Sequence, residues 1–125
     1  MATRPRFDDE TLAALARGKI LGIRAGDEHR FIGIWMVVVE RRLFVRSWDR
    51  REGGWLDAFA ADPRGAIRIG EREIPVRAAR TRSERLKAAV DRAYATKYDT
   101  KGSVKYVRGL RVPSRRDTTT ELMPR

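Results

Sequence analysis

Residues 31–57 read FIGIWMVVVERRLFVRSWDRREGGWLD and contain all three tryptophans of the 125-residue chain. The stretch begins with a mostly apolar run at 31–39, passes through charged residues at 40–42, and continues as an alternating run at 43–48. Two runs rich in β-branched and aromatic residues, joined by a few polar residues, are typical of a β-hairpin. The stretch therefore predicts a hairpin at the centre of the fold.

The length and composition indicate one globular domain that spans residues 1–125. No apolar run is long enough to cross a bilayer, and residues 1–6 lack the apolar core of a signal peptide. Cysteine is absent, which excludes disulfides, thiolate metal sites and thiol catalysis and is typical of a reducing compartment. We therefore expect a soluble cytoplasmic protein with no membrane partner.

The formal net charge is +11, and 23 of the 28 basic residues are arginine. Guanidinium groups bind phosphates and carboxylates in bidentate fashion, so nucleic acid, a nucleotide or an acidic partner are all candidate ligands. The basic residues are scattered from Arg4 to Arg125, which also fits a charged surface that is mostly solvated. The charge alone does not choose between these two interpretations.

The pattern of apolar residues predicts further elements on both sides of the hairpin. A helix is expected at 7–17, with Asp8 or Asp9 as its cap and Gly18 in the left-handed conformation after its end. The other predicted elements are, in chain order, a strand at 19–25, the hairpin at 31–48, a helix at 55–61, strands at 66–69 and 73–78, a helix at 81–98 and a strand at 118–123.

Some positions in the second half carry specific expectations. Pro75 lacks an N–H group, which favours an edge strand or a bulge. Thr81 and Glu84 have the spacing of a capping box at the start of the long helix. Residues 104–112 are compatible with a short helix or an extended connection, and residues 113–117 are expected to form a basic loop.

The predicted order is α-β-β-β-α-β-β-α-β. Strands connected by hairpins, with helices inserted singly, favour a mainly β fold with α, an antiparallel barrel that the C-terminal strand closes. His29, the only histidine, lies in a predicted turn at 26–30 and is expected to be a surface residue. With one histidine and no cysteine, we expect neither a metal site nor a nucleophilic triad.

Four short runs resemble the split-barrel flavin-binding superfamily, which includes pyridoxamine phosphate oxidase-like and deazaflavin-dependent nitroreductase-like proteins. They are IWMVV at 34–38, LFVRSW at 43–48, GW at 54–55 and DPR at 62–64. The chain as a whole is similar to a small bacterial family called domain of unknown function 2255, and its most similar segments are 34–38, 45–48, 93–98 and 118–125. The resemblance implies an antiparallel split β-barrel that forms a homodimer.

The resemblance also implies a site. In such split barrels the isoalloxazine ring lies along the second and third strands, and hydroxyl and basic residues after the third strand hold the flavin phosphate. Transferred by position, the phosphate role falls on Arg46, Ser47, Arg50 and Arg51 with Arg24 nearby, and Trp35 and Trp48 line the ring. The implied cofactor is phosphorylated and aromatic, FMN or a deazaflavin, and the implied function is that of an oxidoreductase of unknown substrate.

Other interpretations of the same residues stay open. Tryptophans in a hairpin are usually core residues, so Trp35 also fits the core or a dimer interface. Arg46 also fits a purely structural pair with Asp57 or Glu52. The alternative function is a non-catalytic basic barrel that binds nucleic acid or another anionic partner, and a third is a scaffold that uses residues 31–39 only to dimerise.

Overall fold

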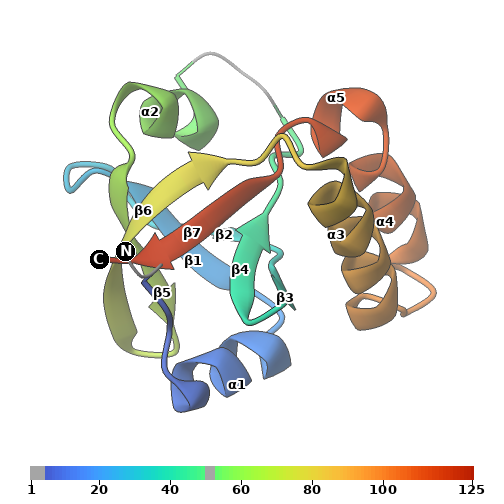
Figure 1. Cartoon of the computed structure of the whole chain (residues 1–125), viewed down its shortest axis with the longest axis horizontal. Coiled ribbons are helices and arrows are strands. Elements are labelled where there is room, and N and C mark those ends of the chain that lie inside the picture. Colours follow the sequence, from blue (N-terminus) through green and yellow to red (C-terminus); the bar gives the residue numbers. More distant parts are fainter. Residues whose placement is uncertain (1–4, 50–52) are drawn as a thin grey trace.

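In the computed structural model, which describes residues 5–49 and 53–125, one antiparallel sheet curls into a split barrel (Figure 1). The described strands have the order β2-β1-β5-β6-β7-β4-β3. Their bounds are β1 Leu21–Ala25, β2 Ile32–Ile34, β3 Val37–Val39, β4 Arg42–Val45, β5 Arg64–Ile69, β6 Arg72–Arg80 and β7 Thr120–Pro124. The antiparallel split barrel expected from the sequence is confirmed.

Helices cover the ends and one side of this sheet. They are α1 Asp9–Arg17, α2 Trp55–Ala61, α3 Glu84–Lys97, α4 Val104–Leu110 and α5 Pro113–Arg116. In Figure 1, α3, α4 and α5 lie together beside β4 and β3, whereas α1 and α2 lie at opposite ends of the sheet. One apolar cluster fills the barrel, and a second packs between β3, β4, α3 and α4.

The observed chain order differs from the predicted one because the apolar run at 31–39 is two strands. β2 pairs with β1, whereas β3 pairs with β4, so the two lie at opposite ends of the strand order. Trp35 and Met36 carry the chain from one edge to the other. The predicted hairpin is confirmed only for β3 and β4, whose turn residues Glu40 and Arg41 have φ of 54° and 62°, as in a tight two-residue hairpin.

The crossing at Trp35 and Met36 is held by the C-terminal end of α3. The Tyr98 hydroxyl accepts a hydrogen bond from the Met36 N–H at 3.1 Å and donates one to the Lys19 carbonyl at 2.7 Å. The Lys97 ammonium donates to the carbonyls of Leu15 and Met36, both at 3.0 Å. Because burial raises the pKa of Tyr98 to about 12, its hydroxyl keeps the proton that it donates.

The prediction of an edge strand at Pro75 is wrong, since β6 pairs with β5 on one side and β7 on the other. The Arg125 N–H donates to the Pro75 carbonyl at 3.1 Å, opposite the end of β7. In a strand the N and O atoms of one residue point to the same side, so the missing N–H also faces the end of β7. A central strand tolerates proline at this position because the pairing of β6 with β7 ends there, so few ladder hydrogen bonds are lost.

Two predicted helix ends also differ. α3 begins after Ser83, whose hydroxyl accepts from the Leu86 N–H at 3.1 Å, whereas the Thr81 hydroxyl accepts from the Ser83 N–H. Gly18 follows α1 with a φ of −67°, not in the left-handed region. A Cβ atom there would lie 3.0 Å from the Ile69 side chain, so close packing rather than conformation favours glycine.

The structure of the C-terminal third decides between the helix and the extended connection that the sequence allowed at residues 104–112. Residues 104–110 are helical, and the expected basic loop contains the short helix α5. The last strand begins at Thr120 rather than at residue 118. The hydroxyls of Thr118 and Thr119 donate back to the carbonyls of Arg115 and Arg116, each at 2.6 Å, and so hold both threonines in the turn.

Removing one oxygen from the crossing tests its importance. We expect Tyr98→Phe to lower the free energy of unfolding by about 1–3 kcal/mol, because the buried Met36 N–H loses its acceptor. Tyr106→Phe is the matched control, since the Tyr106 ring is exposed. Urea denaturation followed by circular dichroism measures both, and equal stabilities would contradict the role assigned to Tyr98.

Candidate functional site

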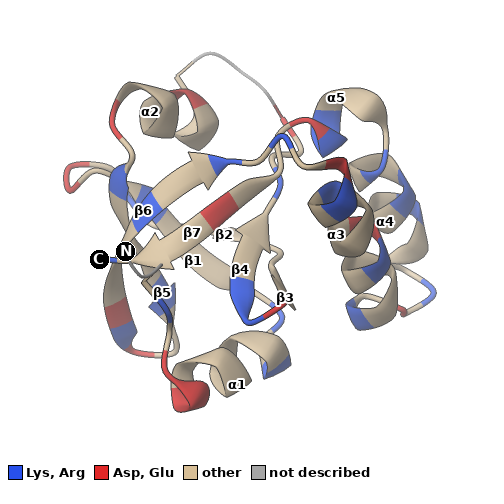
Figure 2. Ribbon diagram, in the orientation of Figure 1, with Lys and Arg blue, Asp and Glu red and all other residues tan. Residues whose placement is uncertain are grey.

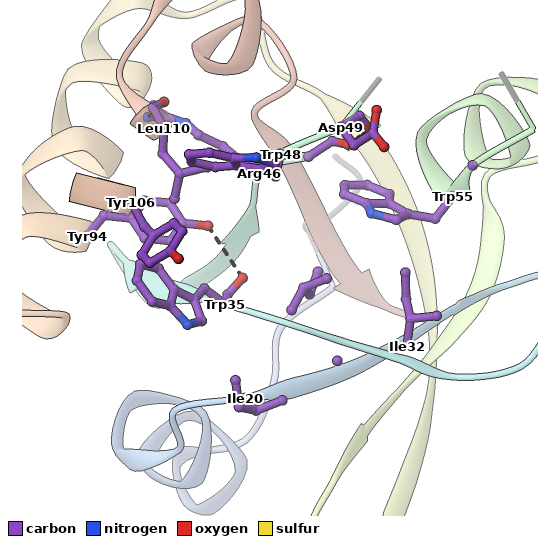
Figure 3. Close-up of a pocket in the computed structure, with 14 residues that line it drawn as sticks. Ile20, Ile32, Trp35, Arg46, Trp48, Asp49, Trp55, Tyr94, Tyr106 and Leu110 are labelled. Carbon is purple, nitrogen blue, oxygen red and sulfur yellow. Dashed lines mark hydrogen bonds between the residues drawn. The ribbon is translucent and has the colours of Figure 1, made fainter. Parts of the chain in front are cut away.

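A cavity of about 560 Å³ opens beside the crossing at Trp35 and Met36. Its walls come from β2, from the segment after β4, from the start of α2 and from α3 and α4 (Figure 3). Five of its lining residues are aromatic: Trp35, Trp48, Trp55, Tyr94 and Tyr106. The three tryptophans singled out by the sequence therefore line one cavity, together with Arg46 and Ser47.

Trp48 is held as a flat plate at one side of this cavity. The Arg115 guanidinium stacks 3.7 Å from the centroid of the indole, and the Arg115 Nε donates to the Trp48 carbonyl at 2.8 Å. The indole also lies against Gly109 of α4, where a Cβ atom would come within 2.3 Å of the ring. Trp48 nevertheless stays 44% exposed, and Figure 3 shows it above the cavity, across from Trp35.

Trp35 forms another wall. Its ring stacks on Tyr98 with centroids 4.0 Å apart and planes 7° apart, and it meets the edge of Tyr106 at 6.2 Å. The Tyr94 hydroxyl donates to the Trp35 carbonyl at 3.4 Å (Figure 3). Burial raises the pKa of Tyr94 far above its usual range, so this phenol remains a donor. Both the backbone and the ring of Trp35 are thus held by α3.

Arg46 lines the cavity, but its guanidinium is engaged by protein groups and its side chain is fully buried. It makes an ion pair with Asp91 at 2.6 Å and not with Asp57, while Glu52 lies outside the described residues. Three further donations go to the Thr119 hydroxyl at 2.8 Å and to the carbonyls of Leu110 and Lys87, both at 3.0 Å. Its geometry therefore suits positioning the wall better than binding a phosphate.

Ser47 is also bound to the chain. Its hydroxyl donates to the Asp49 carbonyl at 2.5 Å, and its N–H donates to the Thr118 hydroxyl at 2.9 Å. Ser47 is nevertheless a lining residue of the cavity, and a serine hydroxyl that donates one hydrogen bond keeps its capacity to accept. Arg50 and Arg51, the next residues expected at the site, lie outside the described residues.

Arg24 lies apart from the aromatic cavity, on β1. It lines a smaller cavity of about 180 Å³ with His29 and Arg30, and this cavity shares Ile32, Gly54 and Trp55 with the aromatic one. The two cavities are therefore neighbours on one surface. Its guanidinium lies 4.5 Å from the centroid of the Phe31 ring, and its buried Nε has no hydrogen-bond partner among the residues that the structure describes.

Sequence reasoning missed several lining residues. Tyr94 and Tyr106 come from α3 and α4, and no local pattern connected these helices with a site at least 39 residues earlier in the chain. His29 was expected only as a surface residue, yet it borders the cavity that contains Arg24. The presence of all three tryptophans within residues 31–57 was the signal that pointed to the aromatic character of the cavity.

Two further features concern the described part of the chain. Within residues 5–49 and 53–125, no group of three or more His, Cys, Asp or Glu side chains is placed to hold a metal ion. No described helix has both the length and the apolar character that crossing a membrane requires.

The fold and the cavity define a class, a split-barrel protein with an aromatic pocket at the break between two edge strands. The family described as "Uncharacterized protein conserved in bacteria (DUF2255)" matches residues 19–122, and the chain belongs to this family. None of the curated proteins matches the chain.

Two solved structures share the fold at low identity. The conserved hypothetical protein Rv2991 from Mycobacterium tuberculosis has a TM-score of 0.60 and 10% identity over 98% of this chain and 82% of its own. An FAD-binding protein (mll6688) from Mesorhizobium loti has a TM-score of 0.62 and 12% identity over 92% of this chain and 85% of its own. These likenesses establish the split-barrel fold.

The ion pair between Arg46 and Asp91 generates a stability prediction. We expect Asp91→Ala to lower the free energy of unfolding by about 3–5 kcal/mol, because it leaves the buried Arg46 charge uncompensated. Glu73→Ala, which breaks the exposed pair with Arg68, is the control and should cost about 0–1 kcal/mol. Urea denaturation at neutral pH compares the two, and a loss for Asp91→Ala no larger than that of the control would contradict the analysis.

Proposed function

We propose that the aromatic cavity binds the ring system of FMN or a deazaflavin and that the protein is an oxidoreductase. The observation that carries the proposal is the cavity itself, about 560 Å³ in volume and walled by Trp35, Trp48 and Trp55. This volume lies within the usual range of small-molecule and cofactor sites. The FAD-binding description of the Mesorhizobium loti neighbour supports a flavin as the ligand class.

The walls fit a flat, largely apolar ring. The Arg115 guanidinium covers one face of the Trp48 indole, so a ligand ring can stack only on the other face. Trp35 is held by Tyr98 and cannot collapse into the cavity. Since both plates are fixed before a ligand arrives, little side-chain entropy is lost on binding.

The phosphate would lie toward the smaller cavity. Arg24 and Arg30 supply guanidinium groups there, His29 supplies an imidazole, and Ile32 and Trp55 connect this cavity with the aromatic one. Arg24 is suited to this role because it forms no ion pair among the described residues. Arg50 and Arg51 keep the phosphate role that the resemblance implies, and Arg46 positions Ser47 and Trp48.

When bound, such a cofactor would supply hydride transfer at its ring. The chain's own residues bind and orient the ring, hold the phosphate and exclude water from one side of the slot. If the cofactor supplies the chemistry, the chain needs few acid–base side chains. Burial raises the pKa of Tyr94 and of Tyr98, so both phenols stay protonated, which agrees with a structural role for them. The side of the cavity that Ile20 and Ile32 line is open in the single chain.

The open side also supports a homodimer. Ile20 and Ile32 line the cavity there and are 56% and 43% exposed, and β2 is an edge strand of the described sheet. Large apolar side chains that stay exposed beside an unpaired strand are typical of an interface. A second copy placed on this surface would cover the slot and shield its ligand from water.

The phosphate assignment is tested by comparing two ligands. We expect Arg24→Ala to weaken FMN binding roughly 10- to 100-fold, the range of a hydrogen bond to a charged group, and to leave riboflavin, which lacks the phosphate, nearly unchanged. Arg68→Ala is the matched control, because Arg68 also contacts the Phe31 ring but borders neither cavity. Flavin fluorescence titration gives the affinities.

Separate outcomes test the two parts of the proposal. If neither FMN nor a reduced or oxidised deazaflavin binds the wild-type protein, the cofactor proposal fails. If FMN binds but Arg24→Ala and Arg68→Ala lose the same affinity, the ring slot stands and the phosphate assignment fails.

A substitution that places one charged side chain on the open side of the cavity tests the dimer. We expect the wild-type protein to have twice the mass of the chain, and Ile32→Lys to have the monomer mass, because the interface cannot bury an unpaired ammonium group. Val112→Lys, at a similarly exposed apolar position outside both cavities, is the control and should remain dimeric. Light scattering coupled to size exclusion measures the mass, and a monomeric wild-type protein would contradict the prediction.

A further inference from the structure

The positive charge is concentrated in one part of the fold. Residues 100–116, which contain α4 and α5, include no Asp or Glu. Their cations are Lys101, Lys105, Arg108, Arg111, Arg115 and Arg116. Figure 2 shows these basic residues along α4 and α5, at the side of the molecule away from β5 and β6.

Most of these cations are available to a ligand. Arg116 pairs with Asp91 and Glu84, and Arg115 stacks on Trp48. Among the described residues, no ion pair engages the other four, Lys101, Lys105, Arg108 and Arg111, and all are exposed. Elsewhere on the surface, several arginines pair with carboxylates, as in the pairs Arg64–Asp62 and Arg85–Glu40.

Two aromatic rings lie close to Lys105, one of these four cations. Tyr106 of α4 is 45% exposed, and its ring meets the edge of Trp48 with centroids 5.7 Å apart. The Lys105 ammonium lies 5.1 Å from the centroid of the Tyr106 ring. The surface made of Trp48, Lys105, Tyr106, Arg108 and Arg111, which we term the α4 surface, therefore combines cations with ring faces.

We propose that the α4 surface binds single-stranded nucleic acid, with phosphates on Lys105, Arg108 and Arg111 and bases stacked on Tyr106 and the exposed part of Trp48. Lys105 and Arg108 are three residues apart, so they are neighbours on one side of the helix, and Arg111 continues the row. Single strands are bound in this way, by aromatic platforms beside cations that follow the backbone.

The structure favours a nucleic acid over a membrane. An interfacial helix inserts its apolar face into lipid, but Val107 and Leu110, the apolar face of α4, are buried against the protein. What remains outside is a row of cations and exposed rings. Stacking also requires unpaired bases, so we expect a single strand to bind more tightly than a duplex of equal length. Trp48 and Tyr106 also line the aromatic cavity, so a strand stacked on them and a flavin bound in the cavity would compete for the same rings.

The first test is the salt dependence of binding to a fluorescently labelled 12-nucleotide deoxythymidine strand. Three phosphate contacts predict a slope of about −2 for log K against log salt, because each contact contributes roughly −0.7. The variant Lys105→Ala/Arg108→Ala/Arg111→Ala should bind at least about tenfold more weakly, with a flatter slope. The control Arg17→Ala/Arg72→Ala/Arg77→Ala removes the same charge from exposed positions on α1 and β6 and should retain nearly all of the affinity.

The second test separates stacking from charge. Tyr106→Leu should weaken binding about tenfold while leaving the salt slope unchanged, and Tyr106→Phe, which keeps the ring, should bind like the wild-type protein. Thermal melts of all variants establish that they are folded.

Several outcomes overturn the proposal. Equal losses in the two triple variants would mean that overall charge, not the α4 surface, attracts the strand. A duplex bound as tightly as the single strand, or Tyr106→Leu bound like the wild-type protein, would remove the aromatic platform. Sedimentation with phosphatidylserine vesicles in the absence of any oligonucleotide binding would assign the surface to a membrane instead.

Discussion

The buried guanidinium of Arg46 is the interaction on which the arrangement of this molecule depends. It leaves the end of β4 and meets α3 through Asp91 and the Lys87 carbonyl, α4 through the Leu110 carbonyl, and the turn before β7 through Thr119. A buried charge is costly unless it is paired and hydrogen-bonded. Since this set of neighbours supplies the pair and the acceptors together, Arg46 ties the docking of α3 and α4 to the end of β4.

This docking fixes the positions of the residues that follow β4. Ser47 and Trp48 follow Arg46 directly, so the anchor places the indole against Gly109 and Arg115. A second anchor, the Tyr98 hydroxyl at Met36, holds Trp35 on the opposite wall. The cavity thus has two rigid plates, each fixed by a polar group of a distant element. α4 contributes to both proposed functions, because its Tyr106 lines the cavity and also belongs to the α4 surface.

The accuracy of the sequence predictions varied with the range of the forces involved. A helix at 7–17 capped by Asp8 or Asp9 was predicted from local propensity, and the structure has α1 at 9–17 with Asp8 as its cap. The turn that joins β3 to β4 was also predicted, within a longer hairpin at 31–48. The division of residues 31–39 was not, because the run contains no polar residue at the break. At the break the Met36 N–H donates to the hydroxyl of Tyr98, 62 residues away, and the two halves of the run serve opposite edges of the sheet.

The same contrast holds for the site. From its sequence alone, the chain is recognisable as an arginine-rich antiparallel barrel whose tryptophans cluster between residues 35 and 55, since composition and alternation are local properties. Only the tertiary structure showed that Arg46 pairs with Asp91 and that Arg24 lines a neighbouring cavity instead of the aromatic one. It also showed that, among the described residues, the exposed cations of α4 form no ion pair. The physical reason is that the availability of a charge depends on which carboxylates and carbonyls the fold brings within hydrogen-bonding distance, and sequence spacing does not report that distance.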